Sequence, residues 1–374
     1  MKIIQVCPTY LPDIGGIATH VKELSEMLVK MGHDVEVVCT DPSQKLPKNE
    51  VINGVRVSRF WAFAPGEAYY FSPGMYFYLR STECDVIHAH NYHSFQALFA
   101  ALAGKKKFIF TPHTFGFSRS LFRNFLHKLY RPIGSYIFDS ADTVISTAQF
   151  ERNWLSQTFR ISDSKLIYIP LPINPARTIV NRQTSGVKRI GYFGRLSIEK
   201  NLKVLISAFK LLRTKKSDIE LFIAGDGPIR NELEESAKGI EGVAFLGRLP
   251  QSELESFIQT LDIFVLPSIF EVSPRAVIEA MSRNIPVVTT PVGELPQVFE
   301  HGKHCMFIKI DDPVDTAEKI MLLMEDRQLA EKIAQAGRVL VEERYDIKKV
   351  ILEYLRIYGA ISSSREHMPR AHRS

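Results

Sequence analysis

The stretch LDIFVLPSIFEVSPRAVIEAMSRNIPVVTTPVG, residues 261–293, carries the strongest structural pattern in this chain. Its apolar run at 263–266 predicts a short buried strand, and the run at 285–289 predicts a second one. Between them, residues 274–282 repeat apolar side chains at the spacing of one helical face. A strand, a helix and a strand in this order are typical of a parallel sheet covered by helices.

The predicted helix begins in a loop that also holds a glutamate. We expect the Ser273 hydroxyl to cap the helix and Pro274 to occupy its first position. The free N–H groups from Ser273 to Arg275 then form a site for a phosphate. Because acids beside an anion site repel phosphate, Glu271 in the loop and Glu279 on the helix fit better as acceptors for sugar or ribose hydroxyls. Taken alone, the two glutamates are as consistent with solvated surface carboxylates as with hydroxyl acceptors.

Length and composition narrow the class of protein. A chain of 374 residues favours two domains. Its four cysteines have no paired spacing, which fits a reducing compartment and excludes a recognisable zinc motif. The first strand is too soon interrupted for a signal peptide, and no apolar run approaches the roughly 20 residues that span a bilayer. We therefore expect a cytoplasmic protein, or one that is peripheral at the inner face of the membrane.

The net charge of +6 and the pI near 9.0 suggest anionic partners, such as nucleotides or phospholipid surfaces. The basic residues accompany no recognisable nucleic-acid module, so we expect no nucleic-acid partner.

The alternation of strands and helices occurs twice along the chain. It predicts one Rossmann-like α/β domain over residues 1–175 and a second over 189–345, joined by a linker at 176–188. Two such halves imply a cleft between them, where ligands commonly bind. Residues 361–374 lack apolar periodicity and predict a disordered tail.

A basic loop in the second half is a candidate diphosphate site. In GYFGRLSIEKN, residues 191–201, Gly194 permits a tight turn while Arg195 and Lys200 supply two cations. A diphosphate needs such compensation when it leaves carrying negative charge. In isolation two loop cations are more often solvated, and their significance depends on the Gly225–Pro228 turn and the two glutamates that follow.

The first half offers a glycine loop and two histidines. Gly15 and Gly16 lie between the first predicted strand and helix. Asp41 follows the second strand, as the ribose-binding acid does in dinucleotide-binding folds, but the G-x-G-x-x-G spacing is absent. His20 lies on the helix, where a structural role is as consistent with the pattern as a catalytic one. His113 follows a predicted strand at the rim where an active-site loop is expected, and is the better candidate.

Two further patterns suggest ligands. The HAHNYH stretch contains His88 and His90, which strand alternation places on one face; since no carboxylate partner is evident, we expect no metal site. Residues 105–131 mix basic residues with apolar ones at helical spacing, as on a helix at an anionic membrane surface. An ordinary amphipathic helix docked on its own sheet explains the same pattern.

Taken together, these motifs resemble those of the retaining glycosyltransferases of family 4, which have the GT-B fold. The resemblance runs in order from the glycine loop to the last predicted helix. Its most specific part is the stretch quoted first. The residues there that match the family pattern are Glu271, Glu279, Ala280, Met281, Pro286, Val287, Val288, Pro291, Val292 and Gly293. The sequence departs from the family at Val272 and Ser273, where members often carry Gly and an aromatic or apolar residue.

The resemblance implies a role for each candidate residue. Glu271 contacts the donor sugar and Glu279 the nucleotide ribose, while Arg195 and Lys200 neutralise the leaving diphosphate. His113 lies against the donor sugar at the reacting face. The Gly15–Gly16 loop approaches the donor phosphate and sugar, and a last helix at about 346–360 crosses back to the first domain.

The resemblance therefore implies a retaining, metal-independent hexosyltransferase without a cofactor. Its donor is a nucleotide-diphosphate sugar, with UDP or GDP as the nucleotide, and its acceptor is a hydroxyl of a glycan or a lipid-linked molecule. Since a fold does not fix a reaction, two alternatives stay open. One is a sugar-nucleotide epimerase or phosphorylase of the same fold, and the other is a non-catalytic scaffold that binds a membrane or a nucleotide.

Overall fold

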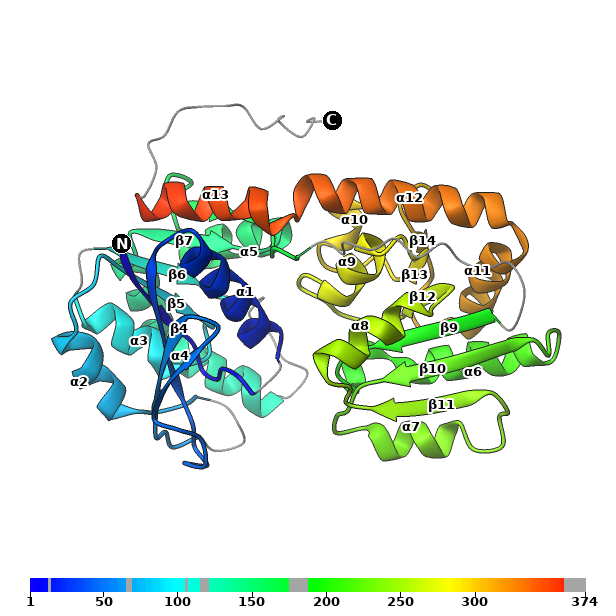
Figure 1. The fold of residues 1–374 in the computed structure, drawn as a ribbon, viewed down its shortest axis with the longest axis horizontal. Coiled ribbons are helices and arrows are strands. Elements are labelled where there is room, and N and C mark those ends of the chain that lie inside the picture. Colours follow the sequence, from blue (N-terminus) through cyan, green and yellow to red (C-terminus); the bar gives the residue numbers. More distant parts are fainter. Residues whose placement is uncertain (13–14, 65–68, 105–106, 115–120, 175–187, 360–374) are drawn as a thin grey trace.

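A computed structural model describes residues 1–12, 15–64, 69–104, 107–114, 121–174 and 188–359, with the backbone alone at 121–128. The chain forms two α/β domains side by side, and two consecutive helices run along one edge of both (Figure 1). The predicted fold class, two Rossmann-like domains built on parallel sheets, is confirmed. The predicted linker at 176–188 lies outside the described residues except for Lys188, and so does the predicted tail at 361–374.

The first domain contains an eight-stranded sheet of order β3-β4-β2-β1-β5-β6-β7-β8, in which only β3 and β4 pair antiparallel among the described strands. Asn53 and Gly54 join these two strands with φ of 52° and 83°, as a two-residue hairpin turn requires. The strands are β1 (Lys2–Val6), β2 (Asp34–Thr40), β3 (Asn49–Ile52), β4 (Val55–Phe60), β5 (Val86–His90), β6 (Phe108–Thr111), β7 (Thr143–Ser146) and β8 (Leu166–Tyr168).

Helices cover both faces of this sheet, each through its own apolar cluster. One face packs against four helices: α2 (Pro73–Ser81), α3 (Phe95–Leu102), α4 (Leu121–Ser140) and α5 (Gln149–Phe159). The other face packs against α1 (Gly16–Lys30) and, from the end of the chain, α13 (Ile347–Tyr358). The buried side of α13 includes Val350, Tyr354 and Tyr358, so the last helix belongs to the core of the first domain.

The second domain contains a parallel six-stranded sheet of order β11-β10-β9-β12-β13-β14. Its strands are β9 (Lys188–Phe193), β10 (Ile219–Ala224), β11 (Val243–Gly247), β12 (Ile263–Leu266), β13 (Val287–Thr289) and β14 (Met306–Phe307). Its helices are the 3-10 turn η2 (Ile198–Lys200), α6 (Leu202–Arg213), α7 (Arg230–Ser236), α8 (Gln251–Gln259), α9 (Arg275–Ser282), α10 (Leu295–Val298), α11 (Pro313–Glu325) and α12 (Arg327–Arg344). None of the helices in the described ranges is long and apolar enough to cross a bilayer.

The expected cap of α9 is wrong. The helix begins at Arg275, Pro274 is its N-cap with ψ of 87°, and no side chain caps it. The Ser273 hydroxyl is buried and bonds no partner. Serine caps a helix from the N-cap position itself. The one-residue shift therefore leaves the hydroxyl and the first N–H groups of α9 without the contact that we expected.

Candidate active site

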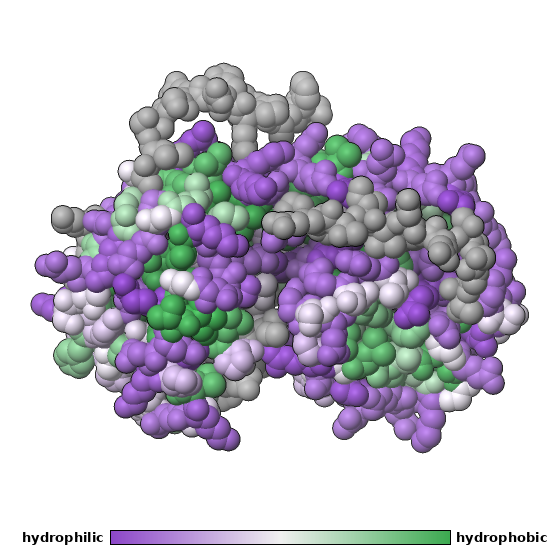
Figure 2. Space-filling view, viewed as in Figure 1, coloured by the Kyte–Doolittle hydropathy of each residue, from purple (hydrophilic) through white to green (hydrophobic). Residues whose placement is uncertain are grey.

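Loops that follow strands of both sheets meet between the two domains. Figure 2 shows hydrophilic side chains on both sides of the line where the domains face each other and over much of the rest of the visible surface, with apolar patches on each domain. His113 follows β6 of the first domain, Lys200 follows β9, and Glu271 follows β12 of the second. Parallel strands place their carboxyl ends at one edge of a sheet, which is where such folds bind ligands.

Lys200 and Glu271 form the centre of the second domain's contribution. The Lys200 Nζ lies 2.6 Å from Glu271 Oε1, and the Ser268 hydroxyl donates to the same oxygen at 2.6 Å. The Glu271 side chain is only 7% exposed, and these two donors hold its carboxylate in one position. Neither contact uses Oε2, and no described residue bonds that oxygen. It is therefore free to accept a ligand hydroxyl.

Glycines allow the loops around this pair to approach each other closely. At Gly293 φ is 61°, and a Cβ there would lie 2.2 Å from the Glu271 carbonyl oxygen. A Cβ at Gly225 would lie 1.8 Å from the Gly194 carbonyl oxygen, because the basic loop and the Gly225–Pro228 turn are in backbone contact. Side chains at these positions would displace the loops that carry the site.

The two predicted cations differ in their surroundings. Lys200 is engaged with Glu271, whereas Arg195 is exposed and forms an ion pair with no described residue. Its carbonyl oxygen accepts a hydrogen bond of 2.8 Å from the Tyr192 hydroxyl, which fixes the backbone of the loop. The Arg195 guanidinium is consequently available to an anion that enters between the domains.

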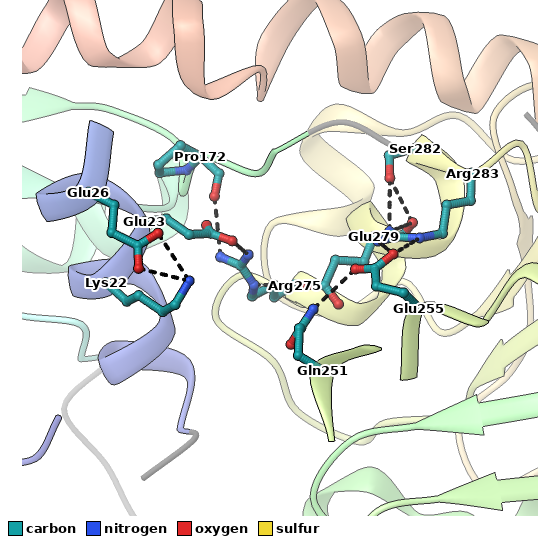
Figure 3. Close-up of polar contacts among 10 residues, drawn as sticks. All are labelled: Lys22, Glu23, Glu26, Pro172, Gln251, Glu255, Arg275, Glu279, Ser282 and Arg283. Atoms are coloured by element: carbon teal, nitrogen blue, oxygen red, sulfur yellow. Dashed lines mark hydrogen bonds and ion pairs between the residues drawn. The ribbon is translucent and has the colours of Figure 1, made fainter. Parts of the chain in front are cut away.

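Arg275 joins the two domains (Figure 3). Its guanidinium contacts Glu279 Oε1 at 2.7 Å on its own helix, Glu23 Oε1 at 2.5 Å on α1, and the Pro172 carbonyl oxygen at 3.2 Å. Burial raises the pKa of Glu23, and the Arg275 charge opposes that rise. Glu279, the predicted ribose acceptor, therefore has one carboxylate oxygen bound to Arg275. The sequence predicted a binding role for the backbone of Arg275 and missed this bridging role of its side chain.

The glycine loop has no structural need for glycine within the described residues. A Cβ at Gly15 or Gly16 would meet nothing within 4 Å, and neither has a positive φ. Glycine in an open loop at a helix N-terminus is consistent with close approach of a ligand to the backbone. Asp41 instead serves its own loop, since it accepts hydrogen bonds from Ser43 and from the Leu46 N–H.

His113 lies in a histidine cluster. Its backbone has φ of 48°, a strained value for a residue with a side chain, and such strain is common at functional sites. One ring nitrogen of each of His20, His90 and His113 lies within 4.8 Å of the others. The His90 Nδ1 to His113 Nε2 distance is 3.3 Å, and ring contact between His88 and His90 confirms that they share a face.

Burial keeps these histidines neutral. It lowers the pKa of His113 to about 3 and holds the pKa of His20, His88 and His90 well below the ordinary value. His113 is partly exposed, while the other three are fully buried. A neutral imidazole is suited to hydrogen bonding rather than to proton donation at neutral pH.

Glu151 is a contributor that sequence analysis missed. It is fully buried at the start of α5 and accepts the N–H of Thr114 and the N–H of Thr147, each at 2.7 Å. The first of these bonds holds the loop that carries His113. Desolvation raises the pKa of Glu151 to about 7, against the hydrogen bonds, which lower it. Its only sequence signal is an acid that falls in the first turn of α5.

The proposed membrane segment at 105–131 is described in part. Residues 105–106 and 115–120 lie outside the described residues, and the segment from 121 onward is helical, as predicted. Tyr130 is buried and donates to the Ser94 carbonyl oxygen, while Leu129 is 60% exposed. This helix therefore docks on its own domain through one face.

Two Rossmann-like domains that meet at polar loops, bridged by a last helix that returns to the first domain, define a GT-B protein. The chain belongs to glycosyltransferase family 4, as the resemblance predicted: residues 14–177 match the model described as Glycosyltransferase Family 4, and residues 179–340 match the one described as Glycosyl transferases group 1. It is accordingly a glycosyltransferase.

Similar proteins agree with this family along nearly the whole chain. A glycogen synthase of Mycobacterium tuberculosis is 26% identical, with 99% of this chain and 97% of the relative covered. A phosphatidyl-myo-inositol mannosyltransferase of Mycolicibacterium smegmatis is 26% identical, with 97% and 95% covered. The solved structure of Anabaena HepE in complex with UDP-glucose superposes with a TM-score of 0.76 at 17% identity, over 96% of this chain and 100% of the other. That likeness confirms the GT-B fold.

Proposed function

We propose that the protein is a retaining, metal-independent hexosyltransferase that uses a nucleotide-diphosphate sugar, with UDP or GDP as the nucleotide. The observation that carries the proposal is the Lys200–Glu271 pair, 2.6 Å apart, which joins the loop after β9 to the buried carboxylate after β12. It presents one free carboxylate oxygen beside a cation, which suits a sugar hydroxyl next to a diphosphate. The relatives are named as a glycogen synthase and a phosphatidyl-myo-inositol mannosyltransferase, and HepE was solved with UDP-glucose, which supports a hexose donor.

Each residue then has a task in the transfer. Arg195 and Lys200 neutralise the diphosphate, and the uncapped N–H groups at the start of α9 add donors to it. Glu271 orients the sugar. Glu279 orients the ribose, which competes with Arg275 for the Glu279 carboxylate. His113, neutral at physiological pH, orients a sugar hydroxyl by a hydrogen bond.

Transfer with retention proceeds at one face of the sugar. The bond from the anomeric carbon to the β-phosphate oxygen breaks, and the bond to the acceptor oxygen forms on the same face. The acceptor hydroxyl proton passes to the departing phosphate oxygen, so the step requires no protein base. Two cations and helix N–H groups supply the charge compensation that a metal supplies elsewhere, which supports metal independence.

The acceptor is proposed to be a glycan or a lipid-linked molecule, reached from the cytoplasmic face of the membrane. Four large aromatic side chains on the first domain support an apolar or membrane-near acceptor. Their exposed fractions are 53% for Trp61, 61% for Phe63, 42% for Phe71 and 67% for Phe77. Sedimentation with anionic liposomes checks this, with Phe77→Ser as the test and Val339→Ser on α12, 46% exposed, as the control. Equal sedimentation of both variants and the parent would remove the membrane from the proposal.

The donor is identified by thermal stabilisation against UDP-, GDP- and ADP-sugars and their free diphosphates, since a ligand that binds the native state raises its stability. Release of diphosphate with candidate acceptors then measures transfer, and NMR of the product tests retention. Arg195→Ala should lower kcat about 100-fold or more. Lys203→Ala, an exposed lysine paired with Glu232 on neighbouring α7, is the matched control and should keep the parent rate.

Each alternative predicts a different result. An epimerase would convert the nucleotide sugar without any acceptor, and a phosphorylase would need inorganic phosphate. Absence of stabilisation by every nucleotide, in a folded sample, would favour the non-catalytic scaffold.

A further inference from the structure

A continuous chain of buried side chains connects the last helix to His113. Strand alternation places Gln5 on β1, His88 and His90 on β5, and Thr111 on β6 on the sheet face that α1 and α13 cover. Tyr358, the last residue of α13, packs against them. The bonds are Gln5 Nε2 to Tyr358 Oη at 3.0 Å, Tyr358 Oη to His88 Nδ1 at 2.7 Å, His88 Nε2 to Thr111 Oγ1 at 2.7 Å, His90 Nε2 to Gln5 Oε1 at 2.8 Å and His90 Nδ1 to His113 Nε2 at 3.3 Å.

The direction of the bonds follows from the chemistry of the groups. A carbonyl oxygen accepts only, so Gln5 Oε1 requires a proton on His90 Nε2. Because burial keeps His90 neutral, its Nδ1 then has no proton and accepts. The partner on His113, Nε2, must therefore donate. His113 is neutral as well, which leaves its Nδ1 as a bare acceptor that no described residue bonds.

Tyr358 extends the chain from Gln5 to His88 and bonds the end of the Gln5 amide opposite to His90. Its oxygen accepts from the Gln5 amide, and its own proton goes to His88 Nδ1. Burial raises the pKa of the Tyr358 hydroxyl, so the proton is retained. His88 then donates through Nε2 to Thr111. A donor is thereby assigned to each of the five bonds, and reversal of the Gln5 amide would reverse every one of them.

We propose that Tyr358 and Gln5 are positioning residues, which act through His90 to hold His113 in the tautomer that presents a bare Nδ1 to a hydroxyl of the donor sugar. This inference rests on the proposed role of His113 in transfer. It gives the return of the last helix a chemical purpose beyond packing, since the helix delivers the Tyr358 hydroxyl to the polar layer behind the reacting face.

The test is the ring tautomer of the labelled histidines, measured by long-range ¹H–¹⁵N correlation spectra of the full chain. His90 and His113 are expected with the proton on Nε2. In Tyr358→Phe, Gln5 loses the partner that orients it, and a mixture of the two tautomers is expected at both rings. Protons on Nδ1 of His90 and His113 in the parent protein would overturn the proposal. So would a stoichiometric metal ion on His90 Nδ1, because it would take the lone pair.

Kinetics separate positioning from folding. Tyr358→Phe should lower kcat about 3- to 10-fold with little change in the donor KM, the loss that one hydrogen bond typically gives. The control is Tyr345→Phe, since the Tyr345 hydroxyl is buried without a partner, and it should leave kcat unchanged. Equal kcat for Tyr358→Phe and the parent would overturn the proposal. An unchanged rate in His113→Ala would instead refute the proposed role of His113 and leave the tautomer assignment to the spectra.

Discussion

The first domain should lose stability steeply as the pH falls from 7.5 to 5.5. His20, His88, His90 and His113 are neutral in the folded chain, with pKa values that burial holds below the ordinary one. In the unfolded chain each takes up a proton near pH 6.5. A group with a lowered folded pKa contributes stability that is present above its unfolded pKa and is lost as the pH falls.

The magnitude follows from proton linkage. To keep one histidine neutral at pH 5.5 costs about 1.4 kcal/mol of unfolding free energy, so four cost about 5.5 kcal/mol. Glu151 acts in the opposite direction, because its folded pKa of about 7 lies above the ordinary 4.5. The folded chain holds that proton at pH 5.5, which returns about 2 kcal/mol. The net loss is about 3.5 kcal/mol, a large part of the 5–15 kcal/mol typical of a domain.

Urea unfolding at three pH values measures this loss for the first domain alone. The chain has two tryptophans, Trp61 and Trp154, and both lie in that domain, so their fluorescence does not report the second. Glu151→Gln removes the opposing proton uptake and should steepen the loss toward low pH. His113→Asn removes one of the four histidines and should make it shallower. An unfolding free energy that is constant between pH 7.5 and 5.5 would refute the assignment of neutral buried histidines.

Two further predictions concern the loops and the contact between domains. Gly293→Ala should lower transfer activity at least tenfold and destabilise the second domain by about 1–3 kcal/mol, because its Cβ would lie 2.2 Å from the Glu271 carbonyl oxygen. The control is Gly302→Ala, where φ is 73° but the space around the Cβ is open, so this variant separates the backbone strain from the clash. Glu23→Gln should weaken the bridge to Arg275 and widen the domain arrangement seen by small-angle scattering, and an identical scattering curve would show that the bridge does not hold the domains.

The sequence predicts the local pattern well and the polar contacts across the fold poorly. The stretch around Glu271 reveals a strand, a helix and a strand because apolar periodicity is a local property. The Ser273 cap fails because a helix start can shift by one residue without changing that periodicity. The bridge of Arg275 to Glu23 joins residues from different domains, and neither residue has a neighbour in sequence that indicates it.

The histidines around His113 show the same limit of prediction from sequence. Strand alternation is enough to place His88 and His90 on one side of the sheet, but a neutral buried cluster needs the helix that covers it. That helix comes from the end of the chain, and its Tyr358 contacts Gln5 from the first strand. Since the register of this contact is set by the packing of α13 and not by local propensity, only the folded chain discloses which ring nitrogen His113 presents. A substitution in the last helix, far in sequence from every motif, should therefore alter the reaction.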